Sequence, residues 1–136
     1  MTRRPVVLFV CVRNSGRSPM AAAFARHLAG GRVDVRSGGS EPGEAVDPDV
    51  ARVMIEAGID LSKERPRKFT SDDVHRADVV VTMGCGDSCP IFPGKRYEDW
   101  QVADPHGHVL ERVRAVRDAL KDKVADLLAS LGVEPA

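Results

Sequence analysis

Apolar residues follow two patterns along this chain, and the two patterns alternate. Short apolar or alternating runs, bounded by glycine, proline or polar residues, predict strands, whereas stretches with an apolar residue every three or four positions predict helices. These patterns predict strands over Pro5–Val10, Val33–Ser37 and Asp78–Met83, and helices over Pro19–Leu28, Pro48–Ala57, Ser71–His75 and Val109–Leu131. The region between Met83 and Val109 has neither pattern and is expected to form a long loop.

The alternation of strands and helices predicts an α/β protein, in which helices cover both faces of a parallel sheet. In open sheets of this kind, ligands bind beyond the carboxyl ends of the strands. All three cysteines follow predicted strands: Cys11 follows the first one, and Cys85 and Cys89 follow the strand that ends at Met83. The sequence therefore predicts a site with several cysteines at this edge of the sheet.

The composition is that of one ordinary globular domain, which is expected to span residues 1–136. Hydrophobic residues make up 43% of the chain, and 20 Lys and Arg residues balance 20 Asp and Glu residues. A general nucleic-acid-binding protein needs a basic surface, so we expect no nucleic-acid partner. The sequence contains no apolar run of membrane-spanning length and no recognisable signal peptide, so we expect a cytoplasmic protein without a membrane partner. In a reducing compartment, three cysteines are expected to be chemical or incidental rather than to form a structural disulfide.

The segment that follows the first predicted strand has the composition of an oxyanion-binding loop. It reads Cys11-Val12-Arg13-Asn14-Ser15-Gly16-Arg17-Ser18 and leads into a predicted helix. A loop between a strand and a helix turns its backbone N–H groups inward, and the helix N-terminus adds positive potential. We therefore expect residues Val12 to Ser18 to bind a tetrahedral oxyanion, with Arg17 donating two parallel hydrogen bonds. The same field favours the thiolate of Cys11, which is the nucleophilic form.

The alternative for Cys11 is a buried structural cysteine beside an ordinary turn. The strand–loop–helix context, with Asn14, Gly16 and Ser18 in place, favours the anion site. A nucleotide-binding P-loop is a poor alternative because the segment does not end in Gly-Lys-Ser or Gly-Lys-Thr.

The Cys-x5-Arg-Ser pattern after the first strand resembles the low-molecular-weight protein tyrosine phosphatase family. The resemblance extends from about Pro5 to Leu131, and Asp104-Pro105 matches the general acid of that family. It implies a three-layer α/β sandwich with a four-stranded parallel sheet flanked by helices. It also implies that Asp104 acts as the catalytic acid.

The additional cysteines distinguish two activities within this fold. Cys85 and Cys89 are four positions apart, which on a helical turn places their Cα atoms about 6 Å apart, within disulfide range. This segment, with Cys89-Pro90-Ile91-Phe92-Pro93, resembles the thioredoxin-coupled arsenate reductases that share the phosphatase fold. Phosphatases of the fold usually place an aromatic residue directly after Asp-Pro, whereas this chain has His106.

The resemblance implies a mechanism that needs no bound cofactor and no metal. Cys11 attacks arsenate, for which phosphate or sulfate would be a mimic, and Asp104 protonates the departing oxygen. Cys85 then attacks Cys11, arsenite leaves, and Cys89 attacks Cys85; the reverse order of Cys85 and Cys89 is the alternative. A thiol donor, thioredoxin or alternatively mycothiol with mycoredoxin, reduces the resulting disulfide.

Other interpretations remain open at this stage. The chain is expected to act as a phosphatase if Cys85 and Cys89 only protect Cys11, or as an oxyanion sensor if it has no turnover. A zinc site of Cys85 and Cys89 with His106 and His108 is disfavoured, because His-x-His is a poor match to the usual ligand spacing. Ala22 occupies the place where some members of the family carry an acidic cation ligand, so no potassium dependence is expected.

Overall fold

A computed structural model describes residues 4–84 and 92–133 of the chain. Its strands and helices alternate for most of the sequence, as the apolar patterns predict. The strands are β1 (Val6–Cys11), β2 (Asp34–Gly39), β3 (Val79–Met83) and β4 (Arg96–Asp99), and the helices are α1 (Arg17–Ala29), α2 (Pro48–Glu56), α3 (Ser71–Arg76) and α4 (Leu110–Ser130).

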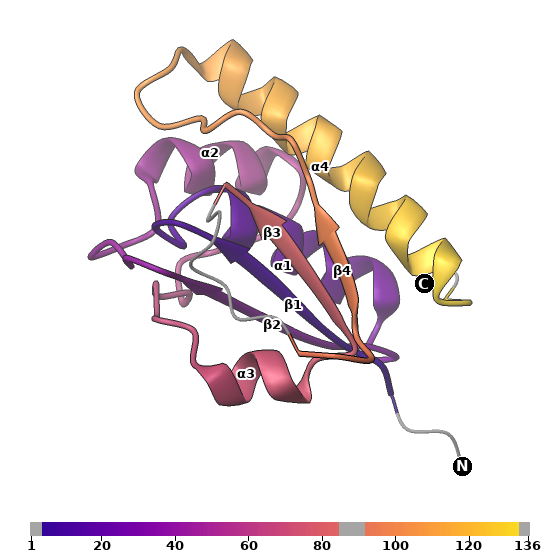
Figure 1. Ribbon diagram of the computed structural model, residues 1–136. Coiled ribbons are helices and arrows are strands. Elements are labelled where there is room, and N and C mark those ends of the chain that lie inside the picture. The colour runs from indigo at the N-terminus through magenta and orange to yellow at the C-terminus, as the bar shows by residue number, and fades with distance from the viewer. Residues whose placement is uncertain (1–3, 85–91, 134–136) are drawn as a thin grey trace.

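The four strands form one parallel sheet in the order β2-β1-β3-β4. From β1 the chain passes outward to β2, then returns across β1 to form β3 on its other side (Figure 1). The strand order therefore reverses at β1. Such a switch point leaves a crevice at the carboxyl ends of the strands, and Cys11 is the last residue of β1.

Helices cover both faces of the sheet, which gives the three layers that the resemblance implies (Figure 1). Alternate residues of β1 point to opposite sides. Val7 and Phe9 belong to the larger core, which is filled by side chains of α1, α2 and α4. Leu8 and Val10 belong to the smaller core on the α3 side. Both faces of β1 are buried, so a continuous apolar run encodes this strand.

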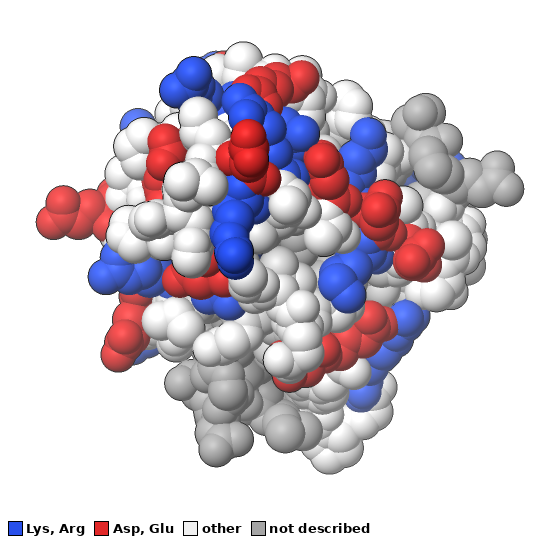
Figure 2. Space-filling model, turned by 90° about the horizontal axis from the view of Figure 1, so that it is seen from above, with Lys and Arg blue, Asp and Glu red and all other residues white. Residues whose placement is uncertain are grey.

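The long helix α4 lies against both α1 and α2. Ion pairs link its exposed side to α2: Glu56 accepts hydrogen bonds from Arg114 at 2.8 and 2.9 Å and from Arg117 at 3.0 Å. Acidic and basic side chains are intermingled over this face of the molecule (Figure 2). None of the helices in the described part of the chain is long and apolar enough to cross a membrane.

Two element boundaries differ from the prediction by two residues, for physical reasons; the others agree to within one residue. Helix α1 begins at Arg17 rather than at Pro19, because a proline is tolerated in the first helical turn, where backbone N–H groups have no partner within the helix. Strand β2 continues through Gly38 and Gly39, which were expected to end it. Both glycines pair with β1, and their lack of a side chain lets other segments pass directly over them. A Cβ on Gly38 would lie 2.8 Å from Cβ of Phe69.

Strand β4 lies inside the region that was expected to be loop alone. Its sequence, Arg96-Tyr97-Glu98-Asp99, lacks the apolar run of a buried strand. It pairs on one side with β3 and forms an edge of the sheet. Charged side chains are common on edge strands, where they discourage pairing with other molecules, so apolar periodicity could not detect this element.

Candidate active site

The loop after β1 is anchored through its carbonyl groups to the connection between β2 and α2. Four backbone N–H groups of that connection donate to it at 2.8–3.2 Å: Ser40 to Cys11, Glu41 to Val12, Gly43 to Arg13 and Asp47 to Ser15. In a trans peptide, the C=O and the following N–H point in opposite directions. The N–H groups of residues 12, 13, 14 and 16 are therefore turned away from this connection, toward the concave side of the loop. Inward-facing N–H groups at a helix start form an anion cradle.

The sulfur of Cys11 lies at the base of this cradle, and the residue is 2% exposed. The backbone N–H of Asn14 donates to Sγ at 3.3 Å, and the hydroxyl oxygen of Ser18 lies 2.9 Å from Sγ. Neighbouring hydrogen bonds show which atom donates in the contact between Ser18 and Cys11. Arg67 N–H donates to Asn14 Oδ1 at 3.1 Å, which orients the amide so that Nδ2 donates to Ser18 Oγ at 2.7 Å. Since Ser18 Oγ accepts that bond, its own proton is free to point at Cys11.

This arrangement gives the buried Cys11 sulfur two hydrogen-bond donors. Both donors can hydrogen-bond to a thiolate, which is the nucleophilic form of cysteine. Asn14 and Ser18 are themselves buried, at 2% and 0% exposure. They act from beneath the loop rather than from the pocket.

The path of the loop depends on two backbone features. Asn14 has a left-handed conformation with φ of 52°, which asparagine tolerates better than most residues. Gly39 of β2 lies directly under the loop, and a Cβ there would be 2.6 Å from the carbonyl oxygen of Val12. The loop can curl back toward α1 because Gly39 has no side chain.

Arg17, the first residue of α1, extends across the carboxyl ends of β3 and β4. Its Nη1 donates to the carbonyl of Val102 at 3.2 Å, and its Nη2 lies 3.9 Å from Oδ2 of Asp104. Gly84 makes room for it, because a Cβ at that position would lie 2.9 Å from Nη1. The guanidinium is thus held by one carbonyl and retains N–H donors for an oxyanion.

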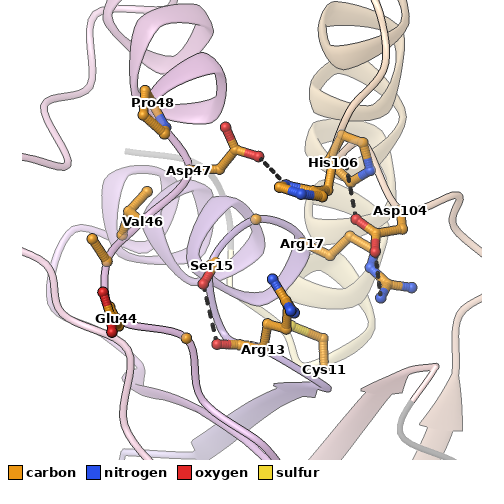
Figure 3. A pocket seen from close by; sticks show the side chains of 14 residues that line it. Cys11, Arg13, Ser15, Arg17, Glu44, Val46, Asp47, Pro48, Asp104 and His106 are labelled. Atoms are coloured by element: carbon orange, nitrogen blue, oxygen red, sulfur yellow. Dashed lines mark hydrogen bonds and ion pairs between the residues drawn. The ribbon is translucent and has the colours of Figure 1, made fainter.

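A pocket of about 250 Å³ opens above Cys11 (Figure 3). One wall is the anion loop, with Arg13, Ser15, Gly16 and Arg17; facing it are residues 43–48 and Asp104, Pro105 and His106. The Asp104-Pro105 turn lies close to the loop, since a Cβ on Gly16 would be 3.4 Å from Cγ of Pro105. Segments far apart in the sequence therefore enclose one cavity that has a cysteine, an arginine and a carboxylate in its walls.

The structure places most of the predicted site residues around this pocket. Cys11, Arg13, Ser15, Gly16, Arg17 and Asp104 line it, Asn14 and Ser18 lie beneath it, and Val12 contributes its backbone. Cys85 and Cys89, and with them the predicted cysteine relay, lie outside the described residues. Within residues 4–84 and 92–133, no group of three or more His, Cys, Asp or Glu side chains is arranged to hold a metal ion.

Sequence reasoning missed three residues that shape the site: Gly39, Arg67 and Asp47. Two of them have a recognisable signal. A pair of glycines at a strand end indicates a close backbone approach, and Asp before Pro is typical of a helix N-cap followed by its first residue. Arg67 contributes its backbone N–H, which no pattern in the sequence distinguishes.

Fold and pocket together define a class of protein: a small α/β protein with a buried cysteine at the switch point of a parallel sheet, inside an oxyanion cradle closed by an arginine. The chain belongs to the low molecular weight phosphotyrosine protein phosphatase family, whose sequence model matches residues 6–136. The predicted family and fold class are thereby confirmed.

Several relatives in this family are named as arsenate reductases. The chain is 40% identical over 131 residues to the glutaredoxin arsenate reductase of Synechocystis sp., covering 92% of this chain and 97% of that protein. It is also similar to the solved structure of a thioredoxin-dependent arsenate reductase of Corynebacterium glutamicum, with a TM-score of 0.85 and 38% identity. That match covers 94% of this chain, which spans only 62% of the Corynebacterium protein. An arginine phosphatase of Geobacillus stearothermophilus shares the fold, with a TM-score of 0.76, 29% identity and coverage of 94% and 93%.

Proposed function

We propose that this protein reduces arsenate to arsenite with Cys11 as the nucleophile. The observation that carries the proposal is the adjacency of β1 and β3. Cys11 pairs with Met83 at the ends of these strands, and the next residue, Gly84, packs against Arg17. Cys85 follows Gly84 directly in the sequence. Cys85 is therefore two residues beyond Met83 in the sequence, and Met83 is the strand partner of Cys11. A reductase needs a second thiol of this kind, whereas a phosphatase does not.

The first step uses groups that surround the pocket. The Cys11 thiolate forms a bond to arsenic while the loop N–H groups and Arg17 bind the remaining oxygens. One arsenic–oxygen bond breaks, and Asp104 supplies a proton to the oxygen that leaves as water. Its distance of 3.9 Å from Arg17 places this carboxyl at the rim of the cradle.

The second step transfers the two electrons. The thiolate of Cys85 attacks Sγ of Cys11, the sulfur–arsenic bond breaks, and its electron pair remains on arsenic, which leaves as arsenite. Cys89 then attacks Cys85, which releases Cys11 as a thiolate and leaves a Cys85–Cys89 disulfide. The order of Cys85 and Cys89 is part of the proposal, and exchanging their roles is its alternative.

A dithiol protein restores the reduced enzyme by exchange with that disulfide. Relatives named for thioredoxin and for glutaredoxin both support an external thiol donor. We favour thioredoxin because a dithiol reduces a protein disulfide without a further partner, with mycothiol and mycoredoxin as the alternative. The proposed reaction involves no bound cofactor.

A coupled assay tests this function. Arsenate is supplied with thioredoxin, thioredoxin reductase and NADPH, and NADPH oxidation is followed for the wild type and for Cys11→Ser, Cys85→Ser and Cys89→Ser. We expect turnover in the wild type and in none of the variants. Full turnover in Cys89→Ser would refute the relay, and arsenate-independent NADPH oxidation would refute the reductase.

A phosphatase is the second candidate, favoured by the likeness to an arginine phosphatase at 29% identity. Its first step is the same attack by Cys11, and hydrolysis of a phosphocysteine replaces electron transfer. Hydrolysis of a small phosphoester that is lost in Cys11→Ser but retained in Cys85→Ser would show the shared step. If the wild type also fails to turn over arsenate, the phosphatase becomes the function of the chain.

A further inference from the structure

His106 and Asp47 face each other across the mouth of the pocket (Figure 3). Nδ1 of His106 lies 3.0 Å from Oδ2 of Asp47. An ionised carboxylate can only accept a hydrogen bond, so Nδ1 carries the proton. We infer that this bond is a positioning contact that holds the acidic carboxyl of Asp104 over Cys11. The inference rests on the proposed function, in which Asp104 delivers a proton to the oxygen that leaves arsenic.

Asp47 is a rigid support on one side of the pocket. Its backbone N–H donates to the carbonyl of Ser15 at 2.9 Å, which ties it to the anion loop. Its Oδ1 accepts the N–H of Asp49 at 3.0 Å, so the same side chain is the N-cap of α2. Pro48 follows as the first helical residue and restricts the backbone further. The side chain is 13% exposed, and its second oxygen is thereby aimed at His106.

Asp104 depends on His106 for its own position. The backbone N–H of His106 donates to Oδ1 of Asp104 at 3.0 Å. The other oxygen, Oδ2, faces Arg17 at 3.9 Å, longer than a hydrogen bond. The Asp104 side chain is 57% exposed, so packing alone does not select one rotamer.

The contacts form a continuous path around the pocket. It runs from Ser15 in the anion loop to Asp47, then to the imidazole of His106, and through the His106 backbone to Asp104. The contact of the imidazole with Asp47 restrains the backbone amide of His106 that holds Oδ1 of Asp104. These contacts thus fix the position of the loop that carries Asp104 relative to the cradle that carries Cys11. Errors of about 1 Å in such registration can cost up to 10²-fold in rate.

The chain offers variants that separate positioning from folding. Asp47→Ser keeps a good N-cap for α2 but is too short to reach His106. His106→Ala removes the imidazole and retains the backbone N–H, whereas His106→Asn places an amide N–H near the position of Nδ1. His108→Ala, at an exposed histidine two residues along, is the matched control. Melting temperatures establish that each variant folds.

The readouts are kcat and KM for arsenate reduction, the same constants for a small phosphoester, and the Kd for inorganic phosphate. We expect His106→Ala and Asp47→Ser each to lower kcat about tenfold, which is less than the 10²–10⁴-fold that a general acid contributes. KM and the phosphate Kd should change less than about twofold. His106→Asn should recover most of kcat, and His108→Ala should match the wild type.

The decisive comparison is made in an Asp104→Asn background. If His106 acts through Asp104, then His106→Ala causes no further loss of kcat there. A further tenfold loss in that background, an equal loss of phosphate affinity, or an unchanged kcat in His106→Ala would overturn the inference. A wild type that hydrolyses the phosphoester but leaves arsenate unchanged refutes the reductase and leaves this comparison intact. A wild type that turns over neither substrate refutes both.

Discussion

Gly38 and Gly39 provide a matched pair of substitutions that separates the stability of the fold from the shape of the oxyanion cradle. They are neighbours in β2, so an added Cβ points to opposite faces of the sheet. In Gly38→Ala the new Cβ would lie 2.8 Å from Cβ of Phe69, on the α3 side. In Gly39→Ala it would lie 2.6 Å from the Val12 carbonyl oxygen and 3.1 Å from the Arg13 carbonyl carbon. Both contacts are too close, and both require backbone to shift.

The two variants should lose similar stability. Overpacking of this kind costs about 1–3 kcal/mol, which lowers the Tm of a domain of this size by roughly 3–12 °C. They should differ in phosphate binding, because only Gly39→Ala displaces the anion loop. Misaligning one hydrogen-bond donor to a charged oxyanion costs about 1.5–3 kcal/mol, or roughly 10–100-fold in Kd.

Thermal unfolding and calorimetric titration with phosphate measure the two effects on the same samples. We expect Gly38→Ala to bind phosphate within about threefold of the wild type and Gly39→Ala to bind it at least tenfold more weakly. Equal affinity in the two variants would show that the loop does not depend on Gly39. A Gly39→Ala variant of unchanged Tm would show that the loop yields without strain.

Three further predictions concern the nucleophile, the arginine and the α2–α4 contact. Ser18→Ala removes a hydrogen-bond donor from the Cys11 sulfur, so alkylation of Cys11 by iodoacetamide at pH 7 should slow; an unchanged rate would show that the hydroxyl does not activate the sulfur. Arg17→Lys keeps the charge but loses the planar fork, so phosphate affinity should fall although Tm changes little, as titration and melting can check. The hydrogen bond from Arg114 is the main cause that lowers the pKa of Glu56 to about 2, so this stabilisation is complete above about pH 4.5 and is lost as pH falls through 2. Urea unfolding should therefore show Glu56→Gln less stable than the wild type at pH 7 and nearly equal to it at pH 2; a constant difference would contradict the ion pair.

Local sequence was sufficient to predict the centre of the molecule. The apolar run before Cys11, the loop to Arg17 and the following helix are each encoded by adjacent residues. The buried strand β3 is predicted by the same kind of run. These elements bury both faces of a strand or one face of a helix, so apolar periodicity reports them directly.

The parts that escaped prediction depend on contacts between distant segments. Strand β4 is held by pairing with β3 rather than by an apolar pattern of its own. The orientation of the Asn14 amide is set by the backbone N–H of Arg67, 53 residues away in the sequence. The contact between Asp47 and His106 spans 59 residues. No local pattern reports such pairs, because each partner alone looks like an ordinary turn residue.

The oxyanion cradle does not by itself choose between phosphate and arsenate, because its N–H donors and Arg17 would bind either tetrahedral anion. A thiol near the end of β3 can make that choice. Since β3 lies beside β1, Gly84, the first residue after β3, contacts Arg17, the arginine that closes the cradle. The proposed relay uses Cys85, which follows Gly84 directly in the sequence. Under the proposed function, a thiol at that position of the sequence is what would add electron transfer to a site that otherwise supports only hydrolysis.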